Sequence, residues 1–253
     1  MIADLLPPAV ATAESTGSEP TLGPGLFPAE QALVRTAGPR RRAEFTAGRA
    51  CARAALAGLG LPAVPVLAGR AGEPRWPAGV TGSITHCAGY RACAAAWTAD
   101  VAALGIDAEP DAGLPAGLIE SVADGAERAW IARQAAAESA VCWDRLLFSA
   151  KEAVGKLWYP MTGHWLGFGQ VAVFPDPAGT FDARVAGSRL TGRWLARDGL
   201  IVTAVTWARL VSRRCADLRA DLRGDLRPVI SAAGTSARAR LPAEARRCAG
   251  QPR

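Results

Sequence analysis

The segment FSAKEAVGK, residues 148–156, contains both lysines of a 253-residue chain that uses arginine for every other basic side chain. Read at about 100° per residue, its apolar positions fall on one side of a helix, while Glu152 and Lys156 share another side. The apolar stripe consists of Trp143, Leu147, Ala150, Val154 and Leu157. An exposed ion pair between Glu152 and Lys156 is one interpretation. The other is a helix that packs with one face and presents an acid and an amine on the next.

Composition indicates a globular protein with a substantial core. Half of the residues are hydrophobic, and the length allows one large domain or two small ones. The chain has no run of apolar residues long enough to span a membrane, and its first ten residues, MIADLLPPAV, lack the pattern of a signal peptide. We therefore expect a cytoplasmic protein with no membrane partner. The six cysteines include no CxxC pair, so neither a disulfide framework nor a zinc site is expected.

The net charge of +6 comes from the C-terminal region. Residues 211–253 contain ten Arg against three Asp and one Glu, which leaves residues 1–210 neutral. This region has no aromatic residue and is rich in Arg, Ala, Gly and Pro, so a disordered tail is predicted. A specific nucleic-acid partner is not expected. Nonspecific binding of anions by the tail is an open alternative.

The first part of the chain predicts an irregular lead-in followed by a helix. Residues 1–34 are rich in Pro, Gly and Thr. Residues 39–60 then place Arg42, Arg49 and Arg53 on one helical face. Such a row is usually solvated, but arginine also binds phosphate through two parallel hydrogen bonds.

Several short segments are typical of strands. A turn at Ala88-Gly89 separates two of them. The first of these two contains the pair Thr85-His86, and His86 is one of only two histidines in the chain. We expect strands over residues 64–67, 80–87, 92–97, 101–106, 170–174, 181–185 and 200–207. A lone histidine of this kind is more often structural than catalytic.

Two carboxylates follow the strand at residues 101–106 directly. Residues i and i+2 of a strand point to the same face, so Asp107 and Glu109 would converge. Adjacent carboxylates repel each other unless a cation lies between them, and Mg²⁺ prefers oxygen ligands of this kind. The alternative is a strand end that emerges into solvent at Pro110.

Taken in order, GSITHC (82–87), GIDAE (105–109) and FSAKEAVGK (148–156) resemble the motifs of 4′-phosphopantetheinyl transferases of the surfactin- and siderophore-synthetase (Sfp-type) family. The resemblance covers roughly residues 35–210. It implies a pseudo-dimeric α+β fold with two similar halves, at about 35–110 and 111–210. It also implies that coenzyme A and Mg²⁺ bind between the halves. A serine of an apo acyl or peptidyl carrier protein would attack the β-phosphate of coenzyme A and release adenosine 3′,5′-bisphosphate. The carriers would belong to polyketide, fatty-acid or nonribosomal peptide synthases.

The resemblance also implies roles for individual residues. The expected metal ligands are Asp107, Glu109 and Glu152, and the expected catalytic residues are Glu152, Lys156 and Lys151. Glu152 would act as a metal ligand or as the base. The residues expected to bind coenzyme A are Arg49, Arg53, Arg70, Arg75, Thr85, His86, Lys151 and Lys156. Relatives carry a lysine in the loop that corresponds to residues 69–79, and Arg70 or Arg75 would take its place in this chain. Glu127 matches a further acid near the metal in relatives.

Two other functions are compatible with parts of the pattern. Acids and lysines around a metal also occur in nucleases of the PD-(D/E)xK type, but those need Glu-x-Lys on a strand, whereas Lys151-Glu152 lies in a predicted helix. A module that binds carrier proteins or nucleic acid without catalysis is the other alternative. The complete set of acids and lysines argues against it.

Overall fold

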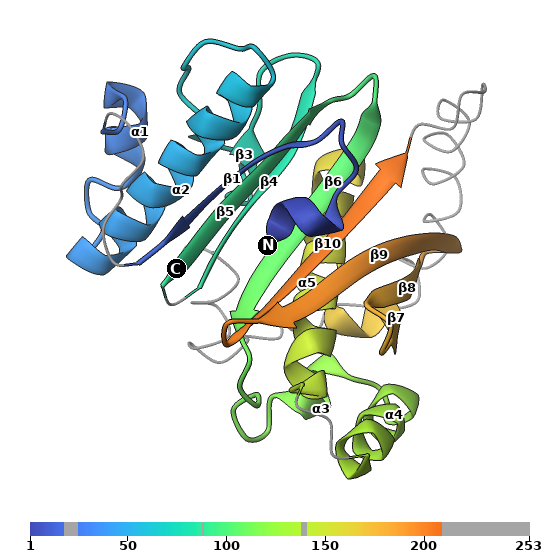
Figure 1. The fold of residues 1–253 in the computed structure, drawn as a ribbon. Helices are drawn as coiled ribbons and strands as arrows, with labels where there is room; N and C mark the ends of the chain where they lie inside the picture. The colour runs from blue at the N-terminus through green and yellow to red at the C-terminus, as the bar shows by residue number, and fades with distance from the viewer. Residues whose placement is uncertain (18–24, 88, 138–140, 209–253) are drawn as a thin grey trace, which may run out of the picture.

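The computed structural model describes residues 1–17, 25–87, 89–137 and 141–208. They form a mixed α+β structure with two main antiparallel sheets and two long helices, which confirms the predicted fold class (Figure 1). The predicted basic tail lies outside the described residues. In the part of the chain that is described, no helix is long and apolar enough to cross a membrane.

The first sheet has the strand order β1-β5-β4 and is covered by helix α2 (Figure 1). The helix buries its small residues against β5 and β1, so the two layers approach closely. The elements of this half are β1 (Ala11–Thr16), α1 (Pro28–Leu33), α2 (Pro39–Gly58), β2 (Leu67–Ala68), β3 (Pro74–Arg75), β4 (Val80–Cys87) and β5 (Tyr90–Trp97). The strand expected at residues 64–67 is reduced to the two residues of β2.

The expectation of an irregular lead-in over residues 1–34 is wrong. A short 3-10 helix, η1 (Ile2–Leu5), is followed by β1, which pairs with β5 from Ala11 opposite Ala95 to Thr16 opposite Tyr90. Strand β1 is an edge strand with mostly half-exposed side chains, so its sequence lacks the apolar alternation that predicts a strand. Hydrogen bonds to β5 therefore fix the extended conformation of β1, which its local sequence does not specify.

The second sheet has the strand order β6-β10-β9-β8-β7, with every neighbouring pair antiparallel. Its strands are β6 (Val101–Pro110), β7 (Val171–Asp176), β8 (Thr180–Val185), β9 (Ser188–Arg197) and β10 (Leu200–Ala208). Between β6 and β7 the chain forms α3 (Ile119–Val122), α4 (Gly125–Ala136), α5 (Trp143–Thr162) and η2 (Phe168–Gln170). Strand β9 was not predicted.

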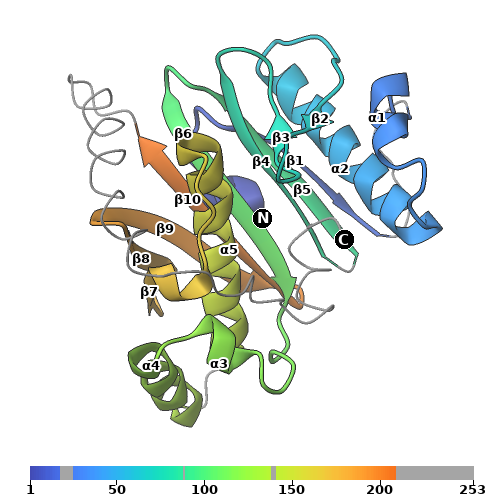
Figure 2. The same ribbon diagram turned by 180° about the vertical axis from the view of Figure 1, so that it is seen from behind.

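Helix α5 contains the opening segment and lies across β6 and β10 (Figure 2). Every residue of the predicted apolar stripe is buried, which confirms that this face packs against the sheet. The helix ends at Thr162 and is capped by Gly163, whose φ of 72° is the left-handed conformation that glycine adopts readily. The orientation of Glu152 and Lys156 therefore follows from the burial of the opposite face.

The two sheets meet along β4 and β6, where side chains take the place of a backbone ladder. The hydroxyl of Ser83 accepts a hydrogen bond from the backbone N–H of Ile106 at 3.2 Å, and that of Thr85 accepts one from Ala108 at 3.0 Å. The expected boundary between the halves near residue 110 is therefore corrected. Strand β6 belongs to the second sheet, and it brings its carboxylates to the junction.

Candidate active site

Contact between β6 and α5 is made at Gly105. A Cβ atom at this position would lie 2.0 Å from the carbonyl oxygen of Ala153 and 2.8 Å from the backbone nitrogen of Leu157. Any side chain here would collide with the helix backbone, so glycine is required for the close approach. Gly105 therefore allows Glu152 and Lys156 of α5 to approach Asp107 and Glu109 of β6.

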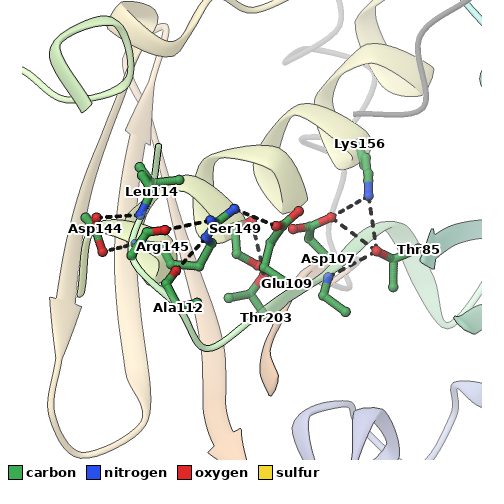
Figure 3. Close-up of polar contacts among 12 residues, drawn as sticks. Thr85, Asp107, Glu109, Ala112, Leu114, Asp144, Arg145, Ser149, Lys156 and Thr203 are labelled. Atoms are coloured by element: carbon green, nitrogen blue, oxygen red, sulfur yellow. Dashed lines mark hydrogen bonds and ion pairs between the residues drawn. The ribbon is translucent and has the colours of Figure 1, made fainter. Parts of the chain in front are cut away.

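Asp107 lies at the centre of the candidate site (Figure 3). It is only 2% exposed, and its Oδ1 accepts hydrogen bonds from Lys156 Nζ at 2.6 Å and from Thr85 Oγ1 at 3.2 Å. The other oxygen, Oδ2, is buried and has no hydrogen-bond partner among the described residues. Leaving a carboxylate oxygen buried and unpaired costs free energy. This atom is therefore a natural ligand position for a cation.

Glu109 lies two residues further along the same strand face and is 1% exposed. Its Oε2 accepts a hydrogen bond from Arg145 at 3.0 Å (Figure 3). Burial, together with the nearby charge of Asp107, raises the pKa of Glu109 to about 8, although Arg145 and Lys156 oppose the change. The predicted convergence of Asp107 and Glu109 is thus present, as is the mutual repulsion that it implies.

Glu152 and Lys156 face this pair from α5. Burial and the charge of Asp107 raise the pKa of Glu152 to about 7, with Lys156 acting in the opposite direction. Burial alone would lower the pKa of Lys156, but the carboxylates of Asp107 and Glu152 outweigh it and raise that pKa. The structure therefore places Glu152 and Lys156 within electrostatic range of Asp107, which also acts on Glu109. These three acids are called the carboxylate cluster.

Thr85 has a different place from the one predicted. It is 1% exposed, and its hydroxyl donates to Asp107 Oδ1 and accepts from the backbone of Ala108. Lys156 Nζ lies 3.5 Å from the same oxygen. A hydroxyl with these partners orients Asp107 and is not available to coenzyme A. The expected direct contact of Thr85 with coenzyme A stays a prediction that this geometry does not favour.

His86 lies beside the carboxylate cluster at the end of β4. Burial lowers its pKa to about 4, with Lys156 and Arg41 acting in the same direction and Glu44 and Asp107 against it. Arg41, at the start of α2, lies 3.3 Å from His86 Nε2. A neutral imidazole can accept this contact. Arg41 was not predicted, although three consecutive arginines at the start of the helix were a visible signal.

Arg49 and Arg53 do not form the exposed cationic row that the helical pattern predicted. Arg53 forms an ion pair with the buried Glu30 at 3.1 Å. Arg49 is 6% exposed and lies over the ring of Phe45 at 4.2 Å, and burial lowers its pKa to about 10. Both therefore pack inside the first half. Their expected contact with a phosphate stays a prediction that this geometry does not favour.

The loop arginines, Arg70 and Arg75, are both exposed at the β2–β3 hairpin. This loop is tied to β4 by Trp76, whose Nε1 donates to the carbonyl oxygen of Gly82 at 3.0 Å. A Cβ at Gly82 would lie 2.6 Å from the Trp76 ring, so glycine makes room for the indole. No contact among the described residues joins either arginine to the carboxylate cluster. Their role toward coenzyme A stays a prediction.

Lys151 is separated from Lys156 by the helix itself. Its Nζ donates to the carbonyl oxygens of Val122 at 2.8 Å and Phe168 at 3.1 Å, and to Glu127 Oε2 at 2.7 Å. An ammonium group has three protons, so all of its donors are used. The predicted contact of Lys151 with phosphates and its predicted catalytic role therefore stay predictions that this geometry does not favour. It is a buried structural residue.

Glu127 belongs to the same buried network and not to the carboxylate cluster. Besides Lys151, it accepts a hydrogen bond from the backbone N–H of Val173 at 2.9 Å, and from Asp124 N at the start of α4. It thereby joins α4, α5 and β7. The suggested place of Glu127 near the metal is also corrected.

Arg145 is the second residue of the site that was not predicted. It is on the first turn of α5, seven residues before Glu152 and eleven before Lys156. At about 100° per residue, these three positions share one helical face, which was a usable signal. The guanidinium is half-buried and reaches Glu109 from the side opposite Asp107, as Figure 3 shows.

The oxygen atoms of the site can be compared with the ligands that Mg²⁺ requires, since the family resemblance implies this metal. Among the described residues, no three His, Cys, Asp or Glu side chains form a ready-made metal cluster. Mg²⁺ needs only one or two protein carboxylates, because water and substrate phosphate complete its octahedron. The unpaired Oδ2 of Asp107, and an Oε1 of Glu109 that has no hydrogen bond among the described residues, provide such oxygens. The residues therefore fit the ion.

Comparison with known proteins assigns the family. Residues 29–96 match the 4′-phosphopantetheinyl transferase N-terminal domain, and residues 103–206 match the 4′-phosphopantetheinyl transferase superfamily domain. The chain is 50% identical over 220 residues to 4′-phosphopantetheinyl transferase Svp of Streptomyces mobaraensis, covering 82% of this chain and 89% of the relative. It is 40% identical to Npt of Nocardia iowensis, covering 82% of this chain and 100% of the relative.

A third relative extends this agreement to another genus. PptT of Mycobacterium tuberculosis is 41% identical over 224 residues, covering 81% of this chain and 97% of the relative. The two matched domains meet between β5 and β6, where the structure changes from one sheet to the other. With both halves matched in order and the carboxylates at their junction, the chain belongs to the 4′-phosphopantetheinyl transferase superfamily.

Proposed function

We propose that this protein transfers the 4′-phosphopantetheine group of coenzyme A to a serine hydroxyl of an apo acyl or peptidyl carrier protein, in a Mg²⁺-dependent reaction that releases adenosine 3′,5′-bisphosphate. The observation that supports it most is the grouping of Asp107, Glu109, Glu152 and Lys156 at the junction of the two halves. Membership in the family supports the use of coenzyme A and of carrier proteins.

Phosphoryl transfer depends mainly on positioning and on neutralisation of charge. Mg²⁺ would be held by Asp107 through its unpaired Oδ2 and by Glu109. The ion would supply positive charge that offsets the negative charge developing on the pyrophosphate. The side chain of Lys156 is 23% exposed and can therefore reach the phosphate while it remains beside Asp107.

Glu152 is the residue best suited to accept the proton of the carrier serine. A general base works best when its pKa is near the operating pH. Burial and Asp107 bring the pKa of Glu152 to about 7, and among the described residues its side chain has no hydrogen bond that would hold it elsewhere. Glu152 is therefore the proposed general base, and the more deeply buried Asp107 is a proposed metal ligand.

Arg41 and His86 would bind a phosphate of coenzyme A from the first half. They lie 3.3 Å apart, and Arg41 is 43% exposed on its side chain. An arginine with exposed donors can form paired hydrogen bonds to phosphate. In this arrangement Arg41 has the role that the family resemblance implies for Arg49 and Arg53.

The nuclease alternative is not supported by the geometry. It requires Glu-x-Lys on a strand next to the acidic residue, whereas Lys151 and Glu152 are on α5 and Lys151 points into a buried network. The binding-module alternative predicts no covalent product. It is therefore distinguished from the transferase by the following experiment.

The experiment incubates the protein with coenzyme A, Mg²⁺ and a panel of purified apo carrier proteins from polyketide, fatty-acid and nonribosomal peptide synthases. We expect mass spectrometry to detect a phosphopantetheine adduct on the carrier serine. The Asp107→Asn variant is the matched control, because it keeps the shape of the side chain but removes the charge. If no carrier of the panel is modified by the wild-type protein, the proposed function is wrong. The carriers that react identify the pathway, and we propose the cytoplasm as the location of the reaction.

A further inference from the structure

Glu109 is held in place by a residue outside the motifs that identify the family. Arg145 Nη1 donates to Glu109 Oε2 at 3.0 Å, and the two side chains are 11% and 2% exposed. Within the described part of the chain, Oε1 of Glu109 accepts no hydrogen bond. The guanidinium therefore fixes one oxygen of the carboxylate and leaves the other unpaired.

The same guanidinium also binds the loop that follows β6. Its Nε donates to the carbonyl oxygen of Ala112 at 2.9 Å, and its Nη2 donates to that of Gly113 at 2.9 Å. Three directed contacts leave the planar group little freedom to rotate. Figure 3 shows Arg145 between this loop and Glu109, on the side away from Lys156.

A neighbouring residue anchors the loop without touching Glu109. Asp144 Oδ2 accepts a hydrogen bond from the backbone N–H of Leu114 at 2.8 Å, and its Oδ1 accepts one from the backbone N–H of Arg145. The contribution of loop anchoring can therefore be separated from that of the contact between Arg145 and Glu109. Asp144 is the matched control position.

Both acids of β6 follow one pattern. Asp107 has Oδ1 bound by Lys156 and Thr85 while Oδ2 has no partner among the described residues. Glu109 has Oε2 bound by Arg145. In each carboxylate, one oxygen is held by hydrogen bonds from the protein and the other is left for a ligand.

We infer that Arg145 is a positioning residue that orients Glu109 so that its free oxygen faces a divalent cation held with Asp107. The inference rests on the proposed function, because it assumes that the two carboxylates bind Mg²⁺. Partners that orient metal ligands in this way typically change metal affinity by about 10- to 100-fold when they are removed. Arg145 is expected to act on metal binding and not on the chemical step.

The test measures Mn²⁺ binding by electron paramagnetic resonance, with saturating coenzyme A and no carrier protein, so that no turnover occurs. Arg145→Gln is expected to weaken Mn²⁺ binding by about 10- to 100-fold relative to wild type. Asp144→Ala is expected to lower thermal stability but to keep Mn²⁺ affinity close to wild type. In the transfer assay, Arg145→Gln should need correspondingly more Mg²⁺ for half-maximal rate, while kcat at saturating Mg²⁺ stays close to wild type.

The outcomes separate this inference from the proposed function. Equal Mn²⁺ affinity in Arg145→Gln and wild type overturns the role of Arg145 alone. Equal weakening in Arg145→Gln and Asp144→Ala shows that the loop is what matters, and also overturns it. If wild-type protein binds no Mn²⁺, the metal assignment of the proposed function fails and the inference fails with it.

Discussion

Lys156 Nζ lies 2.6 Å from Asp107 Oδ1 and joins the helix of the second half to the strand at the junction of the two sheets. The pair is partly buried, so its attraction is weakly screened by solvent. Because the charges of both Asp107 and Glu152 act on this amine, Lys156 is a cation that offsets the repulsion between the two acids. A substrate pyrophosphate would meet the same amine.

Replacing Lys156 by Met should reduce kcat/KM for transfer by about 10²- to 10³-fold, since the variant loses a charge aimed at the phosphate. Single-turnover measurements at saturating coenzyme A would place the loss in the chemical step. Circular dichroism should show an intact fold. A variant with near-normal turnover would mean that Lys156 only pairs with Asp107.

The Glu152→Gln variant is expected to lose about 10²- to 10⁴-fold in kcat, because an amide cannot accept the serine proton. Its coenzyme A affinity, measured by calorimetry, should change little. The substitution also removes a carboxylate whose pKa is raised to about 7 by burial and Asp107, so stability should not fall. A clear loss of stability with full activity would contradict the assignment.

Lys151→Met is predicted to cost about 3 to 5 kcal/mol in the free energy of unfolding, because Glu127 is left buried without its countercharge. The double variant Lys151→Met/Glu127→Gln should recover part of that loss. Chemical denaturation of the wild type, the two single variants and the double variant would measure this in a double-mutant cycle. Turnover per folded molecule should stay close to wild type. If Lys151→Met instead folds normally and fails in catalysis, Lys151 binds substrate after all.

Gly105→Ala should destabilise the protein by about 1 to 3 kcal/mol or more, because the new methyl group would overlap the Ala153 carbonyl oxygen. Activity should fall as α5 moves away from β6. The control is Gly155→Ala on α5, where an added Cβ meets no other atom within 4 Å. That substitution should stabilise by about 0.5 to 1 kcal/mol. Equal thermal shifts in the two variants would show that the close approach has no importance.

Acid should destabilise the protein through His86. Its folded pKa is lowered to about 4 by burial, whereas an unfolded histidine titrates at about 6.5. Between these values the unfolded state binds more protons, so the free energy of unfolding falls as the pH falls from about 6.5 to 4. Urea unfolding of wild type and His86→Asn across this range should show a flatter dependence in the variant. Parallel curves would mean that His86 is protonated in the fold.

The position of a side chain is predictable from the sequence where the local periodicity of a helix or strand determines it. The burial of one face of α5 and the convergence of Asp107 with Glu109 both follow from the repeat of a helix or strand. The local sequence does not predict a role that depends on partners distant in the chain. Arg53 was expected to be exposed, but it is buried because Glu30, 23 residues earlier, supplies a countercharge. Strand β1 was missed because β5 provides its order.

The two lysines of the opening segment separate what local sequence specifies from what the fold adds. Their chemistry, their helix and their difference of about 140° around its axis follow from five positions of spacing. Nothing local says which lysine faces a site. Val122, Glu127 and Phe168 surround Lys151 and satisfy it, whereas β6 brings carboxylates to Lys156. An ammonium group takes its role from the charges and carbonyl groups that surround it, and those are assembled only when the halves pack together.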